Sequence, residues 1–129
     1  MMPKTQFTGS AAVLLVRDVL SAANEWRDKL GFTYERFYGE PPSFVILRRD
    51  GVSVMLKQVS DPTYVVPHSA VTDVWDAYFW VSDVEGLYAE LTARGATIDY
   101  ALCDQSYGCR EFAVQVIDKY SIAFGQPIA

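Results

Sequence analysis

Apolar and polar residues follow one pattern that is written twice along the chain. Residues 11–17 and 76–82 are rich in β-branched, aromatic and small apolar side chains, which predicts a strand in each half. An aspartate follows each strand, and its carboxylate can accept from the free N–H groups of a new helix. Apolar residues then recur at helical spacing up to a glycine, which predicts where each helix ends. These positions are Val19, Ala23, Trp26 and Leu30 before Gly31, and Val84, Leu87 and Leu91 before Gly95.

Three shorter strands are predicted after each helix. They cover about 32–39, 43–48 and 52–58 in the first half, and 96–101, 109–115 and 119–125 in the second. A shift of 68 positions pairs Phe44 with Phe112, Asp50 with Asp118, Ser53 with Ser121, and Gln58 with Gln126. The order βαβββ therefore occurs twice. We expect one domain over residues 1–129, with an internal repeat, 8–58 and 76–126, joined by a proline-containing linker, 59–75.

Side-chain alternation assigns a face to each strand residue. In the strand 76–82, Phe79 faces one way with its apolar neighbours, while Asp76, Tyr78 and Trp80 face the other. The apolar set recurs in both halves, so we expect the two helices to cover that face of the sheet. The opposite face is mixed and is either solvent-exposed surface or the lining of a cavity. Large aromatic side chains favour the cavity, because exposing them to water is costly.

Charge and composition indicate which classes of partner the protein is not expected to bind. The chain has 129 residues, half of them hydrophobic, and a net charge of −5 without any run of Lys or Arg. We therefore expect no nucleic-acid partner. No apolar run reaches membrane-spanning length, and the first ten residues have no apolar core, so we expect no membrane partner and a cytoplasmic location. The two cysteines, Cys103 and Cys109, are interpreted as reduced thiols, with a redox pair as the alternative.

The repeated pattern resembles the vicinal oxygen chelate superfamily, which includes glyoxalase I, bleomycin-resistance proteins and extradiol dioxygenases. The resemblance rests on "VxDV" at the end of each first strand, "LGF" after the first helix, "REFAV" from Arg110 and the closing "IAFGQ". It implies an α+β fold in which two βαβββ modules form an open, cup-shaped sheet, an incomplete barrel with helices on its outer face. It also implies a homodimer that completes each cup across the interface.

Enzymes of that family hold a divalent metal inside the cup with His, Glu or Gln. The resemblance places those ligand positions on Ala11, Met55, Asp76 and Ala123. Alanine has no donor atom, a thioether is a poor ligand for these metals, and a catalytic site needs about three protein ligands. We therefore expect no metal and no other cofactor, and no metal-dependent catalysis.

A metal-independent binding protein is the function that these residues favour. It would sequester a planar, cationic small molecule in an aromatic cup at the dimer interface, as the antibiotic-resistance members of the family do. The candidate ligand-binding residues are Asp76, Tyr78, Trp80, Met55, Lys57, Glu111, Phe37 and Tyr107. Two of these aromatics belong to segments 36–43 and 103–109, which are predicted to be loops able to close over a ligand.

Two other interpretations remain open. The first is a glyoxalase-like lyase or isomerase, or a dioxygenase-type enzyme, acting on an unknown small molecule. Without a metal it would use Asp76 or Glu111 as a general base, which requires a carboxylate in an apolar cavity. The second is a cup filled by its own side chains, which would leave only a dimeric scaffold. The sequence does not name the ligand.

Overall fold

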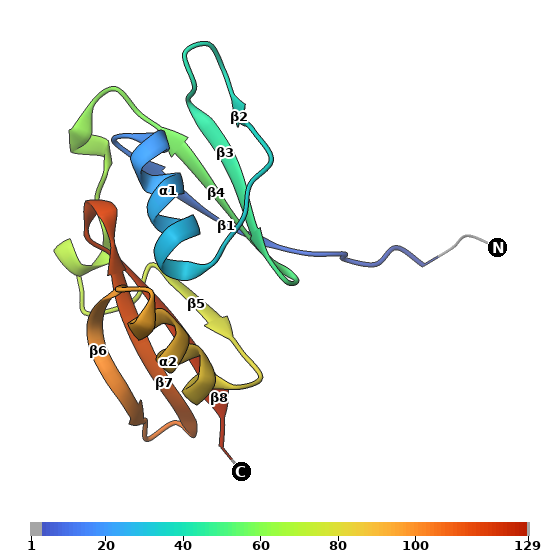
Figure 1. The fold of residues 1–129 in the computed structure, drawn as a ribbon, viewed down its shortest axis with the longest axis vertical. Coiled ribbons are helices and arrows are strands. Elements are labelled where there is room, and N and C mark those ends of the chain that lie inside the picture. The colour runs from blue at the N-terminus through green and yellow to red at the C-terminus, as the bar shows by residue number, and fades with distance from the viewer. Residues whose placement is uncertain (1–3, 129) are drawn as a thin grey trace.

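The computed structural model describes residues 4–128, which form two βαβββ modules. The first consists of β1 (Ala11–Val16), α1 (Val19–Leu30), β2 (Phe37–Tyr38), β3 (Phe44–Arg49) and β4 (Val52–Gln58). The second consists of β5 (Ala77–Trp80), α2 (Val84–Ala93), β6 (Thr97–Asp104), β7 (Cys109–Val116) and β8 (Tyr120–Pro127). Figure 1 shows the first module above the second, and residues 4–10 run away from the body.

Each module builds a four-stranded mixed sheet with the same topology. The strand order is β1-β4-β3-β2 in sheet A and β5-β8-β7-β6 in sheet B, so the first and last strands of each module are neighbours. These neighbours run parallel, and all other pairs are antiparallel. The strands do not close into a barrel. The predicted α+β fold with an open sheet is therefore confirmed.

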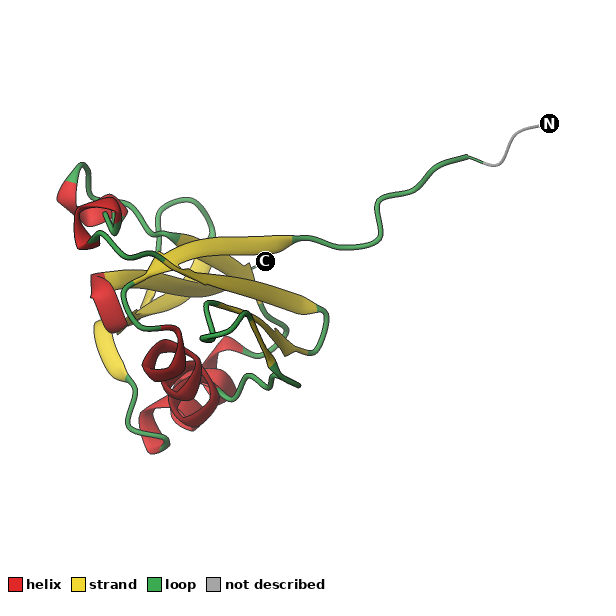
Figure 2. Cartoon of the chain, turned by 90° about the horizontal axis from the view of Figure 1, so that it is seen from above, coloured by secondary structure: helices red, strands yellow, loops and turns green. Residues whose placement is uncertain are grey.

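Both helices lie on the same side of the strands, as Figure 2 shows. Asp18 caps α1 by accepting from two backbone N–H groups, and Asp83 caps α2 by accepting from one. Gln58 Oε1 accepts from Val19 N at 2.8 Å, and Gln126 Oε1 accepts from the first residue of α2 at 3.0 Å. The last strand of each module thus holds the start of that module's own helix.

The hydrophobic core lies between the helices and the apolar sheet faces. Trp26 is buried in it and meets Phe32 edge to face, with ring centroids 5.0 Å apart. Phe112 and Phe124 extend the core into the second module, with centroids 5.3 Å apart. The strand faces predicted to be apolar are the faces that α1 and α2 cover, because alternation leaves only those faces continuously hydrophobic.

Three segments differ from the elements predicted along the chain. Within 32–39 only Phe37–Tyr38 forms a strand, while Thr33 makes an isolated bridge to Arg48. β6 continues to Asp104, with register shifts against β7, so the predicted loop 103–109 shrinks to a hairpin turn. The linker contains two short 3₁₀ helices, Pro62–Tyr64 and His68–Ala70. None of the helices within residues 4–128 is long and apolar enough to cross a membrane.

Candidate functional site

A buried carboxylate lies at the centre of the helix-free face of sheet B. Glu111 on β7 is fully buried and receives the hydroxyl groups of three tyrosines, Tyr78, Tyr100 and Tyr107. The donor–acceptor distance is 3.0 Å from Tyr78 Oη and 2.5 Å from Tyr107 Oη. Gln105 Nε2 adds a longer contact at 3.5 Å. We call Glu111 and these three tyrosines the tyrosine cluster.

The tyrosine cluster contains a carboxylate without a cation. All the groups that reach Glu111 are neutral donors, and no Lys, Arg or His within residues 4–128 lies within ion-pair distance of it. Its neighbour Arg110 faces the other side of β7 and pairs with Asp104 and Glu85. A buried carboxylate needs hydrogen bonds or an opposite charge, and here hydrogen bonds alone satisfy it. The site therefore presents negative potential on this face of sheet B.

The tyrosine hydroxyls are fixed as donors toward Glu111. Burial and then hydrogen bonding to Cys109 and Glu111 raise the pKa of Tyr78 above its ordinary value. Burial and the Glu111 hydrogen bond likewise raise the pKa of Tyr100 and of Tyr107. Each phenol therefore keeps its proton at neutral pH and donates it inward. The lone pairs of its oxygen remain available to accept from another donor.

Aromatic rings extend the cluster toward solvent. Trp75 meets Tyr78 edge to face at 4.7 Å between centroids, and Trp80 lies 5.1 Å from Tyr78 on the other side. Trp75 Nε1 donates to Tyr100 Oη at 2.8 Å, which fixes both rings. Trp80 is 68% exposed, an unusual state for the largest apolar side chain. Neighbouring rings are inclined to each other by 60° and 59°, and together they form an aromatic wall beside the buried Glu111 carboxylate.

Glycine at position 125 makes room for this arrangement. Gly125 on β8 pairs with Glu111 on β7 and Trp80 on β5. A Cβ at that position would lie 1.8 Å from Tyr78 Oη, far inside van der Waals contact. Any larger residue would force the Tyr78 ring away from Glu111. The glycine is therefore required by close approach of the phenol.

Asp76 lies beside the cluster but has a different set of partners. Its carboxylate is almost fully buried and accepts from His68 N at 2.7 Å and from Ser121 N at 2.9 Å. His68 Nδ1 lies 3.7 Å from the same carboxylate. Asp76 thus ties the linker to β8, and both its oxygens are occupied by protein groups. Its predicted role in binding a ligand stays a prediction.

The other residues predicted to bind ligand do not join the tyrosine cluster. Met55 and Lys57 lie on β4 of sheet A, where Lys57 Nζ contacts Ser43 Oγ at 3.2 Å. Phe37 packs against Tyr34, with centroids 4.9 Å apart, at the edge of the core. The structure brings together only Tyr78, Trp80, Glu111 and Tyr107 of the predicted set.

Sequence reasoning did not include Trp75, Tyr100 and Gln105 in the site. Trp75 is the last residue of the predicted linker, and Tyr100 belongs to a strand whose register shifts twice against β7. Strict alternation along a strand assigns no reliable face across such irregularities. The signal that remains in the sequence is the density of tyrosines, Tyr100 and Tyr107, around the hairpin that leads to Glu111.

The metal positions implied by the family resemblance do not supply a usable set of donors. Ala11 and Ala123 have no donor atom, Met55 offers a thioether, and the oxygens of Asp76 accept from backbone N–H groups. Within residues 4–128, no three His, Cys, Asp or Glu side chains are grouped so that they could hold a metal ion. The two cysteines are free thiols in this structure. These residues do not fit the divalent ion of the family's enzymes.

Comparison with known proteins identifies relatives over most of the chain. Residues 10–124 match the family model of the Glyoxalase/Bleomycin resistance protein/Dioxygenase superfamily. A comparison with curated proteins gives no match.

Solved structures with the same fold include TioX from Micromonospora sp. ML1, with 22% identity and a TM-score of 0.73 over 95% of this chain and 100% of that one. The bleomycin-binding protein from bleomycin-producing Streptomyces verticillus, complexed with copper(II)-bleomycin, has 24% identity and a TM-score of 0.67, covering 98% of this chain and 99% of that one. TnmS3, an antibiotic binding protein from Streptomyces sp. CB03234, has 18% identity and a TM-score of 0.71, covering 98% of this chain and 99% of that one. At these identities the likeness establishes the fold.

Proposed function

Because this chain belongs to the Glyoxalase/Bleomycin resistance protein/Dioxygenase superfamily, we propose that it is a binding protein that sequesters a planar, cationic small molecule without a metal. The observation that supports this most strongly is the tyrosine cluster, a buried carboxylate without a cation behind an aromatic wall. Two of the structures that share the fold are described as binding an antibiotic or bleomycin, which supports an antibiotic-like ligand here.

The aromatic wall would bind the planar part of the ligand. Trp80 offers an exposed face beside Tyr78, and stacking on such rings contributes about 0.5–1.5 kcal/mol beyond area burial. A cationic ring system gains a further cation–π attraction of about 0.5–2 kcal/mol. The N–H groups of the ligand would donate to the outward lone pairs of the tyrosine oxygens. Glu111 does not touch the ligand, and it acts by orienting the tyrosines and by its negative charge.

We propose that a homodimer completes the site. The helix-free face of sheet A exposes apolar side chains: Val13 is 60% exposed, and Leu15 beside it also reaches solvent. The linker adds further exposed apolar residues, Tyr64, Val66, Val71 and Val74. Exposed apolar side chains on these segments support an interface there. Sheet A of one protomer would then face sheet B of its partner, with the ligand between them.

The dimer has a direct test. Val13→Glu introduces a charge on the sheet A face, whereas Leu20→Glu introduces the same charge on α1, on the opposite side. Light scattering after size exclusion should show a dimer for the wild type and for Leu20→Glu, and a monomer for Val13→Glu. A monomeric wild type would contradict the proposed dimer.

The ligand class is tested by intrinsic fluorescence. Proflavine is a planar cation, and acridone is a neutral planar analogue of similar size. We expect proflavine to quench tryptophan emission saturably in the metal-stripped protein, and to bind much more weakly to Trp80→Phe. Metal-free bleomycin should also be included. Equal binding of acridone and proflavine would contradict a site built for cations.

A further inference from the structure

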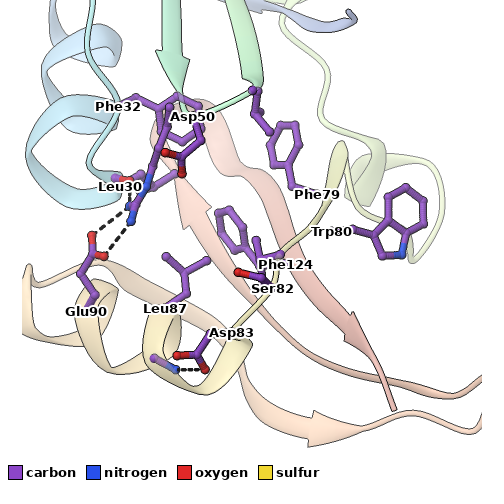
Figure 3. Close-up of a pocket in the computed structure, with 15 residues that line it drawn as sticks. Leu30, Phe32, Asp50, Phe79, Trp80, Ser82, Asp83, Leu87, Glu90 and Phe124 are labelled. Atoms are coloured by element: carbon purple, nitrogen blue, oxygen red, sulfur yellow. Dashed lines mark hydrogen bonds and ion pairs between the residues drawn. The ribbon is translucent and has the colours of Figure 1, made fainter. Parts of the chain in front are cut away.

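A cavity lies on the helix side of the sheets, at the seam between the two modules. It has a volume of about 710 Å³ and is bounded by the β3–β4 turn of the first module and by β5 and α2 of the second. Figure 3 shows that Phe79, Phe124 and Leu87 reach into it, while the Trp80 ring points away. Its size lies within the range of small-molecule sites. We call this cavity the inter-module cleft.

The two modules meet at a second seam, which is closed. There Arg17, at the end of β1, donates to Asp118 in the β7–β8 turn through its backbone N at 3.1 Å and its Nε at 2.7 Å. The Asp118 side chain is only 2% exposed. Ile117 N also donates to Glu25 on α1 at 2.6 Å. An arginine–aspartate pair therefore holds the turn of one module against the helix end of the other.

Aligning the two halves of the repeat shows which ion pair of the closed seam is missing at the inter-module cleft. Asp50 in the β3–β4 turn corresponds to Asp118, and both have a positive φ, 51° and 67° respectively. The residue that corresponds to Arg17 is Ser82, because Val16-Arg17-Asp18-Val19 aligns with Val81-Ser82-Asp83-Val84. Asp50 and Ser82 both line the cleft. A serine cannot span the distance that an arginine spans, so the seam at the inter-module cleft lacks the cation that Arg17 supplies at the closed seam.

The other charged groups around the cleft are already paired. Arg49 forms two hydrogen bonds with Glu90, at 2.8 and 2.7 Å, and also donates to Leu30 O. Glu90 accepts from Arg94 as well, and Asp83 caps α2 at Gly86 N. The exposed carboxylate of Asp50 has no hydrogen bond or ion pair within residues 4–128. The cleft thus combines an apolar floor with an acidic group at its rim, which lies near the Arg49 guanidinium but has no ion pair of its own within residues 4–128.

We propose that the inter-module cleft binds a small molecule with an apolar body and a guanidinium or amidinium head. The head would pair with Asp50 as Arg17 pairs with Asp118 at the other seam. A planar fork of N–H donors matches a carboxylate better than a point charge does. The apolar body would cover Phe79 and Leu87, which are half-buried, above the buried ring of Phe124. This site is separate from the tyrosine cluster, which lies on the other face of the sheet.

Benzamidine and benzamide provide a matched pair of probes, since they have similar shapes and differ in charge. We expect benzamidine to shift the backbone NMR signals of residues that line the cleft, and benzamide to bind roughly tenfold or more weakly. Asp50→Asn should reduce benzamidine affinity by a similar factor, and asparagine tolerates the positive φ at this position. Asp73→Asn, an exposed linker position, is the control for net charge. Equal binding of both probes, or unchanged affinity in Asp50→Asn, would overturn the proposal.

A second variant restores the missing arginine. Ser82→Arg should pair with Asp50, raise the melting temperature and reduce benzamidine affinity roughly tenfold or more, because the side chain would occupy the site of the head group. Benzamidine binding by Ser82→Arg at wild-type affinity would also overturn the proposal. Glu111→Gln should leave the benzamidine-induced NMR shifts of the residues that line the cleft unchanged, which separates this site from the tyrosine cluster.

Discussion

Removing the hydroxyl of Tyr100 tests whether the tyrosine cluster is held together by hydrogen bonds to a buried charge. In Tyr100→Phe, Glu111 loses one donor and Trp75 Nε1 loses its acceptor. A hydrogen bond to a charged group contributes about 1.5–3 kcal/mol, and Trp75 Nε1 can recover part of its loss by bonding to water because this ring is only half-buried. We expect the free energy of unfolding to fall by about 2 kcal/mol.

Tyr107→Phe is the control, because it shows how much stability is lost when a less buried hydroxyl group is removed from Glu111. Tyr107 donates to the same carboxylate but is 55% exposed, so water can replace its hydroxyl. Tyr107→Phe should therefore cost only about 0.5 kcal/mol. For 129 residues the unfolding entropy is about 0.27 kcal/mol per kelvin, so 2 kcal/mol corresponds to a fall of about 7 °C in melting temperature. Calorimetry and urea unfolding would measure both variants. A loss in Tyr100→Phe no larger than in Tyr107→Phe would refute the reasoning.

Three further substitutions test other parts of the structure. Gly125→Ala should displace Tyr78 and destabilise the fold by about 1–3 kcal/mol, measured by urea unfolding; a near-neutral effect would mean that the phenol is not confined. Gln126→Ala removes the acceptor of Val84 N and should cost about 1 kcal/mol, with reduced helicity by circular dichroism. Burial raises the pKa of the Glu25 carboxyl, so the folded protein binds the carboxyl proton more tightly than the unfolded chain does. The free energy of unfolding therefore falls as the pH rises from the unfolded pKa of Glu25 through its folded pKa. Glu25→Gln should therefore be more stable than the wild type at pH 7, and the difference should disappear in acid.

Much of the fold follows from periodicity and capping residues. The strand β4 has the bounds 52–58 that its alternation predicts, and both helices end where a glycine was expected, because such local signals depend little on distant contacts. The short β2 and the long β6 were not foreseen. β6 lies at the edge of its sheet and carries polar residues, so its length depends on pairing with β7 rather than on its own hydrophobic pattern.

The candidate site was only partly predictable for the same reason. Alternation in the strand 76–82 placed Tyr78 and Trp80 on one face, Glu111 was a further candidate residue, and the structure brings these three together. Asp76 has the same strand parity, but its carboxylate accepts from two backbone N–H groups, one of the linker at His68 and one of β8 at Ser121. No pattern along the strand indicates such a contact. The inter-module cleft required the structure as well, since Asp50 and Ser82 are distant in sequence and only the fold places them around the same cavity.

The most direct test of the account is the dissociation constant of proflavine for the metal-stripped wild type and for Glu111→Gln, measured by fluorescence anisotropy. Glutamine keeps the size of the side chain and removes the negative charge behind the aromatic wall, and Asp73→Asn controls for the change in net charge. The account predicts roughly tenfold weaker binding for Glu111→Gln and unchanged binding for Asp73→Asn. Equal affinity in the wild type and Glu111→Gln, with both proteins folded by circular dichroism, would contradict the claim that the buried carboxylate makes this a site for cations.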